Sequence, residues 1–305
     1  MNKENRKEIF FHVGLARAAS TYLQRKVFPQ FKGVHYVPPN QYRRYQQIIA
    51  DTNATKYLVS REFDQRLACQ ARQFAHRFPE AHIILVLRRS DSWIASRYRQ
   101  FVKNGNALSF QEFFDIEHDT GLWKRRDASM WTKIEIIETY FYHKPLVLFQ
   151  EDLATAPYDV FDTMARFMGC EYDKARVSLT PFHTSYSDKQ LHVMLRVSQY
   201  CFALDPTYDA YARWVQWLQR RARLLACYLI LYPAGLVPAA WVSCTPLIAP
   251  QTLAQIQDFF AEDWQRCQEY ALKHNRAWHS CRVPAQTGPP HPQDDTHAKG
   301  RAQQR

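Results

Sequence analysis

Short apolar runs alternate with longer amphipathic stretches along residues 8–170. Between the runs, apolar residues recur at helical spacing, most clearly along 65–78. Parallel strands need helical crossovers that cover both faces of a sheet. We therefore predict an α/β fold of three layers, a parallel sheet flanked by helices. The apolar runs predict buried strands at 9–13, 33–38, 56–60, 82–87 and 146–149.

The helical pattern continues beyond the last predicted strand. It gives one domain, 1–280, which contains an apolar insert at 224–249. From 281 to 305 the chain is rich in proline, glutamine, glycine and histidine and loses all periodicity, which predicts a disordered tail. Further helices are expected at 22–31, 40–50, 91–104, 158–168 and 253–270, with two more between 109 and 143.

The charge of the chain limits the kind of ligand. The 305 residues carry a formal net charge of +11, and 46% of them are hydrophobic, enough for a full core. A basic balance of this size suits a polyanionic ligand. The arginines are dispersed, and neither a zinc-finger spacing nor an RNA-binding aromatic signature is present, so we expect no nucleic-acid partner.

The cysteines and the first residues predict the compartment. The seven cysteines are widely spaced with no Cys-x-x-Cys pair, which indicates free, mostly buried thiols in a reducing environment. Residues 1–8 are charged and run directly into the first predicted strand, so no signal peptide is expected. We predict a cytoplasmic protein.

The junction after the first strand carries the strongest chemical signal. Gly14 permits a sharp turn, and Ser20 and Thr21 stand where the next helix begins. Such a loop offers backbone N–H groups and the positive end of a helix to an anion, and Arg17 adds a charge. The pattern predicts phosphate or sulfate binding, with an ordinary strand-to-helix junction as the alternative. The loop has neither the lysine nor the second glycine of a Walker motif.

A second candidate site follows the fourth predicted strand. Arg88 ends this strand, at the sheet edge where α/β folds bind ligands. Ser96 follows eight residues later within the next helix, so we expect both side chains to converge on one anion. The alternative is a surface arginine and an unrelated helical serine.

Together the two segments resemble the sulfotransferases that use 3′-phosphoadenosine-5′-phosphosulfate (PAPS), in particular bacterial and Golgi-type carbohydrate sulfotransferases. The 5′-phosphosulfate loop of that family reads Gly-x-x-Lys-x-Gly-Thr-Thr/Ser. Gly14, Ser20 and Thr21 match it, whereas Arg17 replaces the lysine and Ala19 the second glycine.

The similarity extends along the chain. Arg88 and Ser96 match the family's 3′-phosphate motif, Arg-x-Pro-x-x-x-x-x-Ser, with Ser90 in place of the proline. Segments 147–169 and 253–270 are similar to its Glu-Asp-Leu segment and its closing helix, so the resemblance covers about residues 8–275.

The resemblance implies a P-loop NTPase-like fold, PAPS as donor and no metal. It assigns Arg17 to the leaving-group phosphate, loop amides and hydroxyls to the 5′-phosphate, and Arg88 with Ser96 to the 3′-phosphate. The residues it implies for donor binding are Gly14, Arg17, Ala18, Ala19, Ser20, Thr21, Tyr22, Arg88 and Ser96.

Glu62 is the candidate general base. It follows the strand 56–60 and should therefore lie at the same sheet edge as Arg17 and Arg88, where nearby cations would keep it ionised. Ser60-x-Glu62 is also similar to the Ser-x-Glu of bacterial-type sulfotransferases. The alternative is a structural salt bridge to Arg61, Arg66 or Arg88. Four histidines are weaker candidates: His12, His35, His118 and His183.

The acceptor is less defined. Segments 40–50, 104–130 and 183–215 carry Tyr, Trp, Arg and Lys and should face it, which suits a sugar or glycolipid. Two other functions stay open: a P-loop kinase, and a non-catalytic nucleotide-binding protein of the same fold.

Residues 224–249 contain no charged residue and follow Arg213, Arg220, Arg221 and Arg223. Prolines at 233, 238 and 246 interrupt the run, which disfavours a membrane span. We predict a peripheral contact with an anionic membrane through 213–249 and a lipid-linked acceptor. Burial inside the domain is the alternative.

Overall fold

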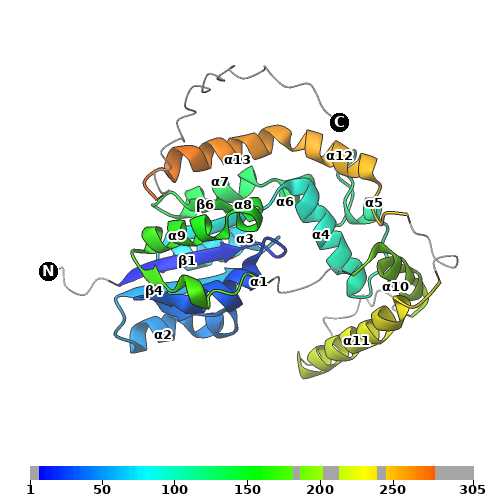
Figure 1. Ribbon diagram of the computed structural model, residues 1–305, viewed down its shortest axis with the longest axis horizontal. Coiled ribbons are helices and arrows are strands. Elements are labelled where there is room, and N and C mark those ends of the chain that lie inside the picture. Colours follow the sequence, from blue (N-terminus) through cyan, green and yellow to red (C-terminus); the bar gives the residue numbers. More distant parts are fainter. Residues whose placement is uncertain (1–6, 181–185, 202–212, 239–244, 279–305) are drawn as a thin grey trace, which may run out of the picture.

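The computed structural model describes residues 7–180, 186–201, 213–238 and 245–278, with only the backbone at 201 and 213–220 (Figure 1). The predicted disordered tail, 281–305, and the candidate base His183 lie outside the described residues.

Five parallel strands form the central sheet (Figure 1). The first strand lies in the middle of the sheet, because the order is β3-β4-β1-β5-β6. The predicted three-layer α/β architecture is confirmed, and each predicted strand is present within a few residues. The strands are β1 (Glu8–Gly14), β3 (His35–Val37), β4 (Lys56–Glu62), β5 (His82–Leu87) and β6 (Leu146–Phe149).

The register brings the candidate residues to one edge of the sheet. Gly14, the last residue of β1, pairs with Glu62 at the end of β4 and with Val86 near the end of β5. Because parallel strands end at a common edge, the loop after β1, Glu62 and Arg88 all emerge there.

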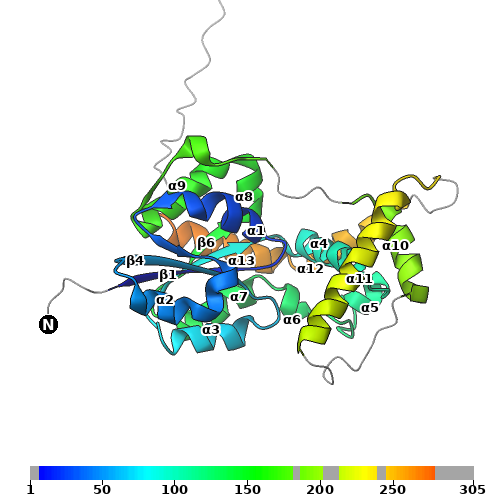
Figure 2. The ribbon, with the colours of Figure 1, turned by 90° about the horizontal axis from the view of Figure 1, so that it is seen from below.

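Helices cover both faces of the sheet (Figure 2), and a hydrophobic cluster lies on each face. One face packs against the helices that follow the site loop and against α9, around Phe28 and Phe161. The other packs against α2, α3 and α7, around Phe74 and Ile137. The helices on these faces are α1 (Ser20–Tyr22), η2 (Leu23–Val27), η3 (Phe28–Gln30), α9 (Pro157–Met168), α2 (Tyr45–Asp51), α3 (Leu67–Ala75) and α7 (Trp131–Tyr140).

The remaining elements extend the domain around the site edge. Helix α4 starts after β5, and α10 packs on α4 and on α11 (Figure 1). Their bounds are α4 (Ser90–Lys103), α5 (Phe110–Phe113), α6 (Arg125–Ala128), α8 (Gln150–Thr155), α10 (Asp188–Cys201), α11 (Arg213–Ala234), α12 (Pro250–Phe259) and α13 (Ala261–His274); η4 (Pro39–Arg44), η5 (Lys174–Arg176) and the pair β2 (Phe31–Lys32) and β7 (Glu171–Tyr172) complete the fold.

Several predicted helices are shorter than their sequence patterns. The stretch 22–31 divides into η2 and η3, because Pro29 at the start of η3 cannot donate a backbone hydrogen bond and so ends the preceding turn. Residues 109–143 form three short helices, α5, α6 and α7, instead of two. A capping box at Ser109 and Glu112 begins α5, which ends within four residues.

The described cysteine side chains are free thiols, as predicted. Only Cys227 and Cys267 are buried, whereas Cys170 is half-buried and Cys69 is exposed. The prediction of mostly buried thiols therefore holds for half of them. Within the described ranges, no helix is both long enough and apolar enough to cross a membrane.

Candidate active site

The loop between β1 and α1 turns sharply at Gly14. A Cβ atom at this position would lie 2.5 Å from Ser20 Oγ and 3.0 Å from His12 Cε1, so the close approach of the returning chain requires glycine. Ser20 Oγ donates a hydrogen bond to the Leu15 carbonyl at 2.9 Å and closes the loop. The hydroxyl proton of Ser20 is therefore used in a hydrogen bond within the loop.

Two residues of the loop adopt left-handed backbone conformations, Arg17 with φ 71° and Ala19 with φ 59°. The Ala18 N–H donates to the Leu15 carbonyl at 3.2 Å. The N–H groups of residues 19–22 donate to no acceptor within the described part of the chain. They surround the start of α1, which is the arrangement that binds phosphate and sulfate oxygens in other proteins.

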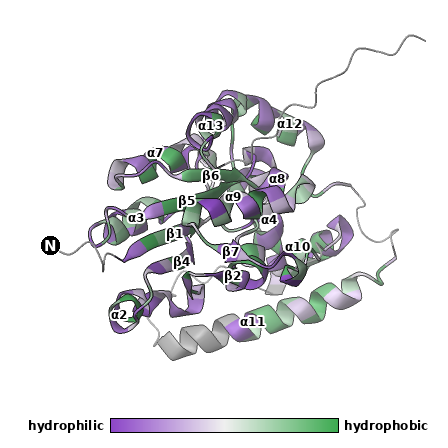
Figure 3. Cartoon of the chain, turned by 60° about the vertical axis from the view of Figure 1, so that its left-hand side comes forward, coloured by the Kyte–Doolittle hydropathy of each residue, from purple (hydrophilic) through white to green (hydrophobic). Residues whose placement is uncertain are grey.

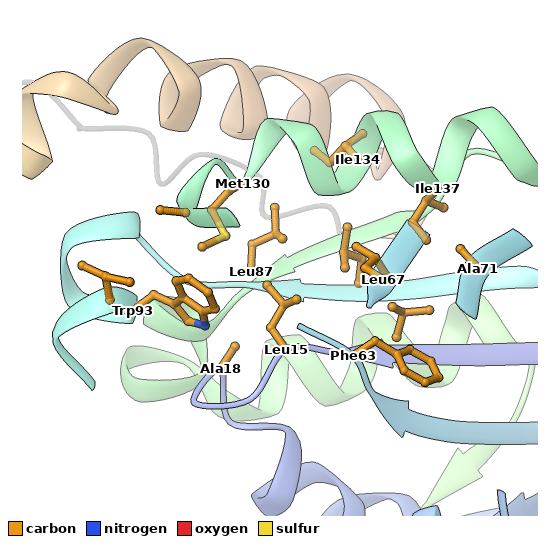
Figure 4. Packing of buried hydrophobic residues seen from close by; sticks show 14 of the residues in the cluster. Leu15, Ala18, Phe63, Leu67, Ala71, Leu87, Trp93, Met130, Ile134 and Ile137 are labelled. Atoms are coloured by element: carbon orange, nitrogen blue, oxygen red, sulfur yellow. The ribbon is translucent and has the colours of Figure 1, made fainter. Parts of the chain in front are cut away.

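Neighbouring elements hold the loop in place at Ala16. Its N–H donates to Asp64 Oδ1 at 2.9 Å, and its carbonyl accepts a hydrogen bond from Trp93 Nε1 at 2.9 Å. The apolar side chains of Leu15 and Ala18 pack beneath it beside Trp93 (Figure 4). The loop is therefore fixed from both sides before any ligand arrives.

Arg88 and Arg17 lie together. Arg88 Nη1 donates to the Arg17 carbonyl at 2.8 Å, and its Nε donates to Ser92 Oγ at 3.0 Å. Arg17 Nε donates to Ser96 Oγ at 2.9 Å. Ser96 therefore bonds to Arg17, whereas Ser92, one helical turn nearer the strand, lies beside Arg88. The convergence of Arg88 and Ser96 on one anion stays a prediction. Ser92 was not among the predicted site residues. Its position four residues after Arg88, in the first turn of the helix that follows, was the available signal.

The two guanidinium groups are partly withdrawn from solvent. Burial lowers the pKa of both groups. Repulsion from Arg97 lowers the pKa of Arg17 further, and repulsion from Arg17 lowers that of Arg88. The negative charges of Glu62 and Glu151 act on these pKa values in the opposite direction. Neither guanidinium group forms an ion pair with a carboxylate of the described residues. Partly buried cations that form no close ion pair are stabilised by an anionic ligand.

Glu62 lies at the end of β4 and faces the same space. Thr21 Oγ1 donates to its carboxylate at 3.4 Å. Burial raises the pKa of Glu62 and nearby Asp64 raises it further, against smaller opposite effects of Thr21, Arg61 and Arg97. The loss of hydration therefore outweighs the nearby cations in the direction of the pKa shift, and the ionised state of Glu62 stays a prediction.

The structural alternative for Glu62, a salt bridge to a neighbouring arginine, is absent from the described contacts. Arg61 donates to the Pro39 carbonyl at 2.9 Å, and Arg88 is bound to Arg17 and Ser92. No ion pair joins Glu62 to either residue or to Arg66 within the described residues. Among the described residues, the Glu62 side chain thus has the long hydrogen bond from Thr21 as its one close polar contact.

The other candidate bases lie away from this space. His12 is fully buried under the loop, where Nδ1 lies 2.8 Å from Ser60 Oγ and burial lowers its pKa to about 3. His35 lies on the edge strand β3, and exposed His118 lies 3.5 Å from Asp115. None of the three lines the cavity described next.

A cavity of about 1390 Å³ joins these groups. It exceeds the roughly 300–1,000 Å³ of a usual small-molecule site and has room for two substrates. Arg17, Thr21, Glu62 and Arg88 line it from the loop and the strand ends. The helices α4, α10 and α11 and the residues before α10 add cationic, amide and phenolic groups: Arg99, Gln100, Lys103, Tyr186, Gln190, Tyr228 and Tyr232.

The segments that complete the cavity lining differ from those predicted to face the acceptor. Segments 40–50 and 104–130 do not line the cavity, and Tyr228 and Tyr232 of the apolar insert do. Their spacing of four residues, which places both on one side of a helix, was the available signal. Within the described residues, no group of three His, Cys, Asp or Glu side chains is arranged to hold a metal ion.

Comparisons with known proteins give a distant likeness. Neither a scan against protein-family models nor a search of curated proteins finds a match. Among solved structures, a sulfotransferase from Alicyclobacillus acidocaldarius is similar over 65% of this chain and 93% of its own, with 17% identity and a TM-score of 0.43. Mouse sulfotransferase SULT7A1 complexed with PAP is similar over 87% and 90%, with 12% identity and a TM-score of 0.42. These scores are low, so the functional proposal rests on this chain's own residues.

The strained loop gives a first prediction, about stability. We expect Ala19→Gly to raise the free energy of unfolding by about 1 kcal/mol, because glycine adopts a positive φ without the steric cost that alanine bears. Chemical denaturation measures the change. Ala18→Gly is the matched control: Ala18 has no positive φ and its methyl group is buried, so that variant should lose stability. A loss of stability in both variants would contradict the strained conformation of Ala19.

Proposed function

We propose that the protein is a PAPS-dependent sulfotransferase that moves the sulfuryl group to a hydroxyl of a sugar or glycolipid acceptor. One observation carries this proposal. Two partly buried arginines, which form no ion pair within the described residues, meet an amide-rich loop in a large cavity that the Glu62 carboxylate also lines. The loop motif and the Arg88–Ser96 spacing support PAPS as the anion, since they resemble the donor motifs of that family.

The residues present fit such a donor. The amides of residues 19–22 and the Thr21 hydroxyl would hold the 5′-phosphate, while Arg17 would neutralise the oxygen that leaves. Arg88, with the α4 hydroxyls of Ser92 and Ser96, would bind the 3′-phosphate that distinguishes PAPS from ATP.

The transfer itself is a displacement at sulfur. The acceptor oxygen forms a new S–O bond as the S–O bond to the 5′-phosphate breaks, and 3′,5′-ADP leaves with the electron pair. Glu62 takes the proton of the acceptor hydroxyl, and Arg17 stabilises the charge that develops on the leaving phosphate oxygen. Holding both reactants in line in one cavity supplies the remaining acceleration.

The described residues bear differently on the two other functions. A P-loop kinase needs a Walker lysine, which the loop does not contain. Asp64 is the other carboxylate next to the loop, and it is bound to the Ala16 N–H and to Arg97 at 3.1 Å. A non-catalytic nucleotide-binding protein is favoured by Arg17 in place of lysine and by its bond to Ser96. Turnover of labelled PAPS in an acceptor screen separates it from the enzyme.

The role of Arg88 gives a second prediction. Arg88→Ala should weaken 3′,5′-ADP binding by about 10- to 150-fold, since a charged hydrogen bond to phosphate is worth about 1.5–3 kcal/mol. Binding of adenosine 5′-phosphosulfate, which lacks the 3′-phosphate, should change far less. Calorimetric titration measures both affinities.

Arg89→Ala is the matched control for this experiment. The neighbouring guanidinium is engaged by Asp91 at 2.7 and 3.0 Å and does not line the cavity, so its removal should leave both affinities unchanged. An equal loss of both ligands in Arg88→Ala would show that Arg88 only supports the loop through the Arg17 carbonyl.

A further inference from the structure

Helix α11 has two different faces. Its inner side chains, Cys227, Leu231 and Ala234, are buried and belong to the core beside α10. Its outer side and the residues just after it carry four large apolar side chains that are 62–86% exposed: Leu225, Leu229, Tyr232 and Leu236. They recur at intervals of four, three and four residues, so they form one continuous outer face. The burial alternative for the apolar run therefore holds for the inner side of the helix and for Leu247 and Ile248 at the end of the run, and it fails for this outer face.

The outer face lies at the margin of the molecule. Figure 3 shows α11 along the lower edge, with predominantly apolar colours over the part that is not grey. The packing of α11 on the domain is made through α10, with which it has its main contact. A soluble domain usually covers or avoids an apolar stripe of this length, so the stripe indicates a contact with something apolar.

The charge of the segment indicates what that partner is. Residues 213–249 contain four arginines and no aspartate or glutamate. Arg221 is exposed at the start of the outer face, whereas Arg223 donates to the Gly105 carbonyl at 2.8 Å and so faces the domain. An apolar helix face with arginine at its border is typical of helices that lie in the interface of an anionic bilayer.

We propose that the outer face of α11 seats the protein on an anionic membrane surface. A second copy of the chain is a poorer occupant, because two segments of like charge would meet: residues 213–249 contain four arginines and no aspartate or glutamate.

The membrane contact deepens the proposed function, on which this second step rests. Tyr232 belongs to the outer face and also lines the cavity, while Tyr228, one turn earlier, lines the cavity from inside. The cavity therefore borders the face that lies on the bilayer. The acceptor class that fits is a lipid-linked one, whose polar group reaches Glu62 while its chain stays in the membrane.

Flotation of the full-length protein with liposomes tests the inference. We expect binding to phosphatidylserine-rich vesicles, weakened by salt, and little binding to pure phosphatidylcholine. The double variant Leu225→Gln and Leu229→Gln should reduce vesicle partitioning by at least about tenfold, because two apolar side chains are lost from the bilayer contact. Leu272→Gln is the matched control, since Leu272 is 66% exposed on α13. It should bind as the unchanged protein does.

Two outcomes would overturn the inference. One is absence of binding to phosphatidylserine-rich vesicles by the unchanged protein. The other is a dimer in sedimentation equilibrium that the double variant abolishes, which would make the face a self-association surface. Titration of the same preparation with 3′,5′-ADP keeps the two proposals separate. If the protein binds 3′,5′-ADP but not vesicles, only the proposed membrane contact is contradicted. If it binds vesicles but not 3′,5′-ADP, only the proposed donor site is contradicted.

Discussion

Glu62→Gln should lower the turnover of PAPS by about 10²- to 10⁴-fold, the usual cost of losing a general base. The glutamine keeps the shape of the side chain and its contact with Thr21 but cannot accept the acceptor's proton. The affinity for 3′,5′-ADP should stay nearly the same, because Glu62 takes no part in holding the donor. Steady-state rates and calorimetry on the same two proteins measure these quantities.

The pH dependence gives this prediction a second readout. Because burial raises the pKa of Glu62, the rate of the unchanged enzyme should fall on the acid side at a pH above the ordinary carboxyl range. The variant should lack this acid limb. If turnover of Glu62→Gln persists within a few-fold and the limb remains, Glu62 is not the base.

The stability of the folded protein should fall as Glu62 ionises, whereas the rate should rise. A carboxyl whose pKa is higher in the folded protein than in the unfolded chain binds its proton more tightly when folded. Its ionisation therefore costs stability, which falls as pH rises from the ordinary to the raised pKa and stays lower above it. Glu62→Gln removes this cost, so at neutral pH the variant should melt no lower than the unchanged protein. A clear drop in its melting temperature would indicate a structural role.

Arg17→Ala is expected to have the second largest effect. Its guanidinium borders the cavity at the end where we place the leaving phosphate, and the loop offers no other cationic side chain. Removing one preorganised donor for developing charge costs about 10²- to 10³-fold in turnover. Rapid-quench measurement of the transfer step under saturating PAPS gives this change in rate.

The control for this prediction is Arg17→Lys. Lysine restores the charge as a single point donor and is the residue of the resembling family, so this variant should recover most of the activity that alanine loses. Equal inactivity of both variants would mean that Arg17 acts through its bond to Ser96 or its backbone conformation.

The position of the site could be read from the sequence because parallel strands end at one edge. The apolar runs place β1, β4 and β5, and the residues that follow them must then emerge together. Gly14, Glu62 and Arg88 were found in this way, without knowledge of any side-chain contact.

The details within the site depend on side-chain geometry that spacing does not encode. Whether Ser92 or Ser96 meets Arg88 is decided by one turn of α4, and both fit the same pattern. Likewise, the sign of the pKa shift at Glu62 depends on how its burial compares with the fields of Arg61 and Arg97. The two-faced nature of α11 was hidden because its inner and outer sides are both apolar.

Calorimetric titration of the full chain with 3′,5′-ADP and with ATP-Mg tests the donor assignment most directly. The 3′-phosphate should contribute about 1.5–3 kcal/mol through Arg88, so 3′,5′-ADP should bind at least about tenfold more tightly than ATP-Mg. Tight binding of ATP-Mg with no heat from 3′,5′-ADP would contradict a PAPS donor site and leave a nucleoside-triphosphate function in its place.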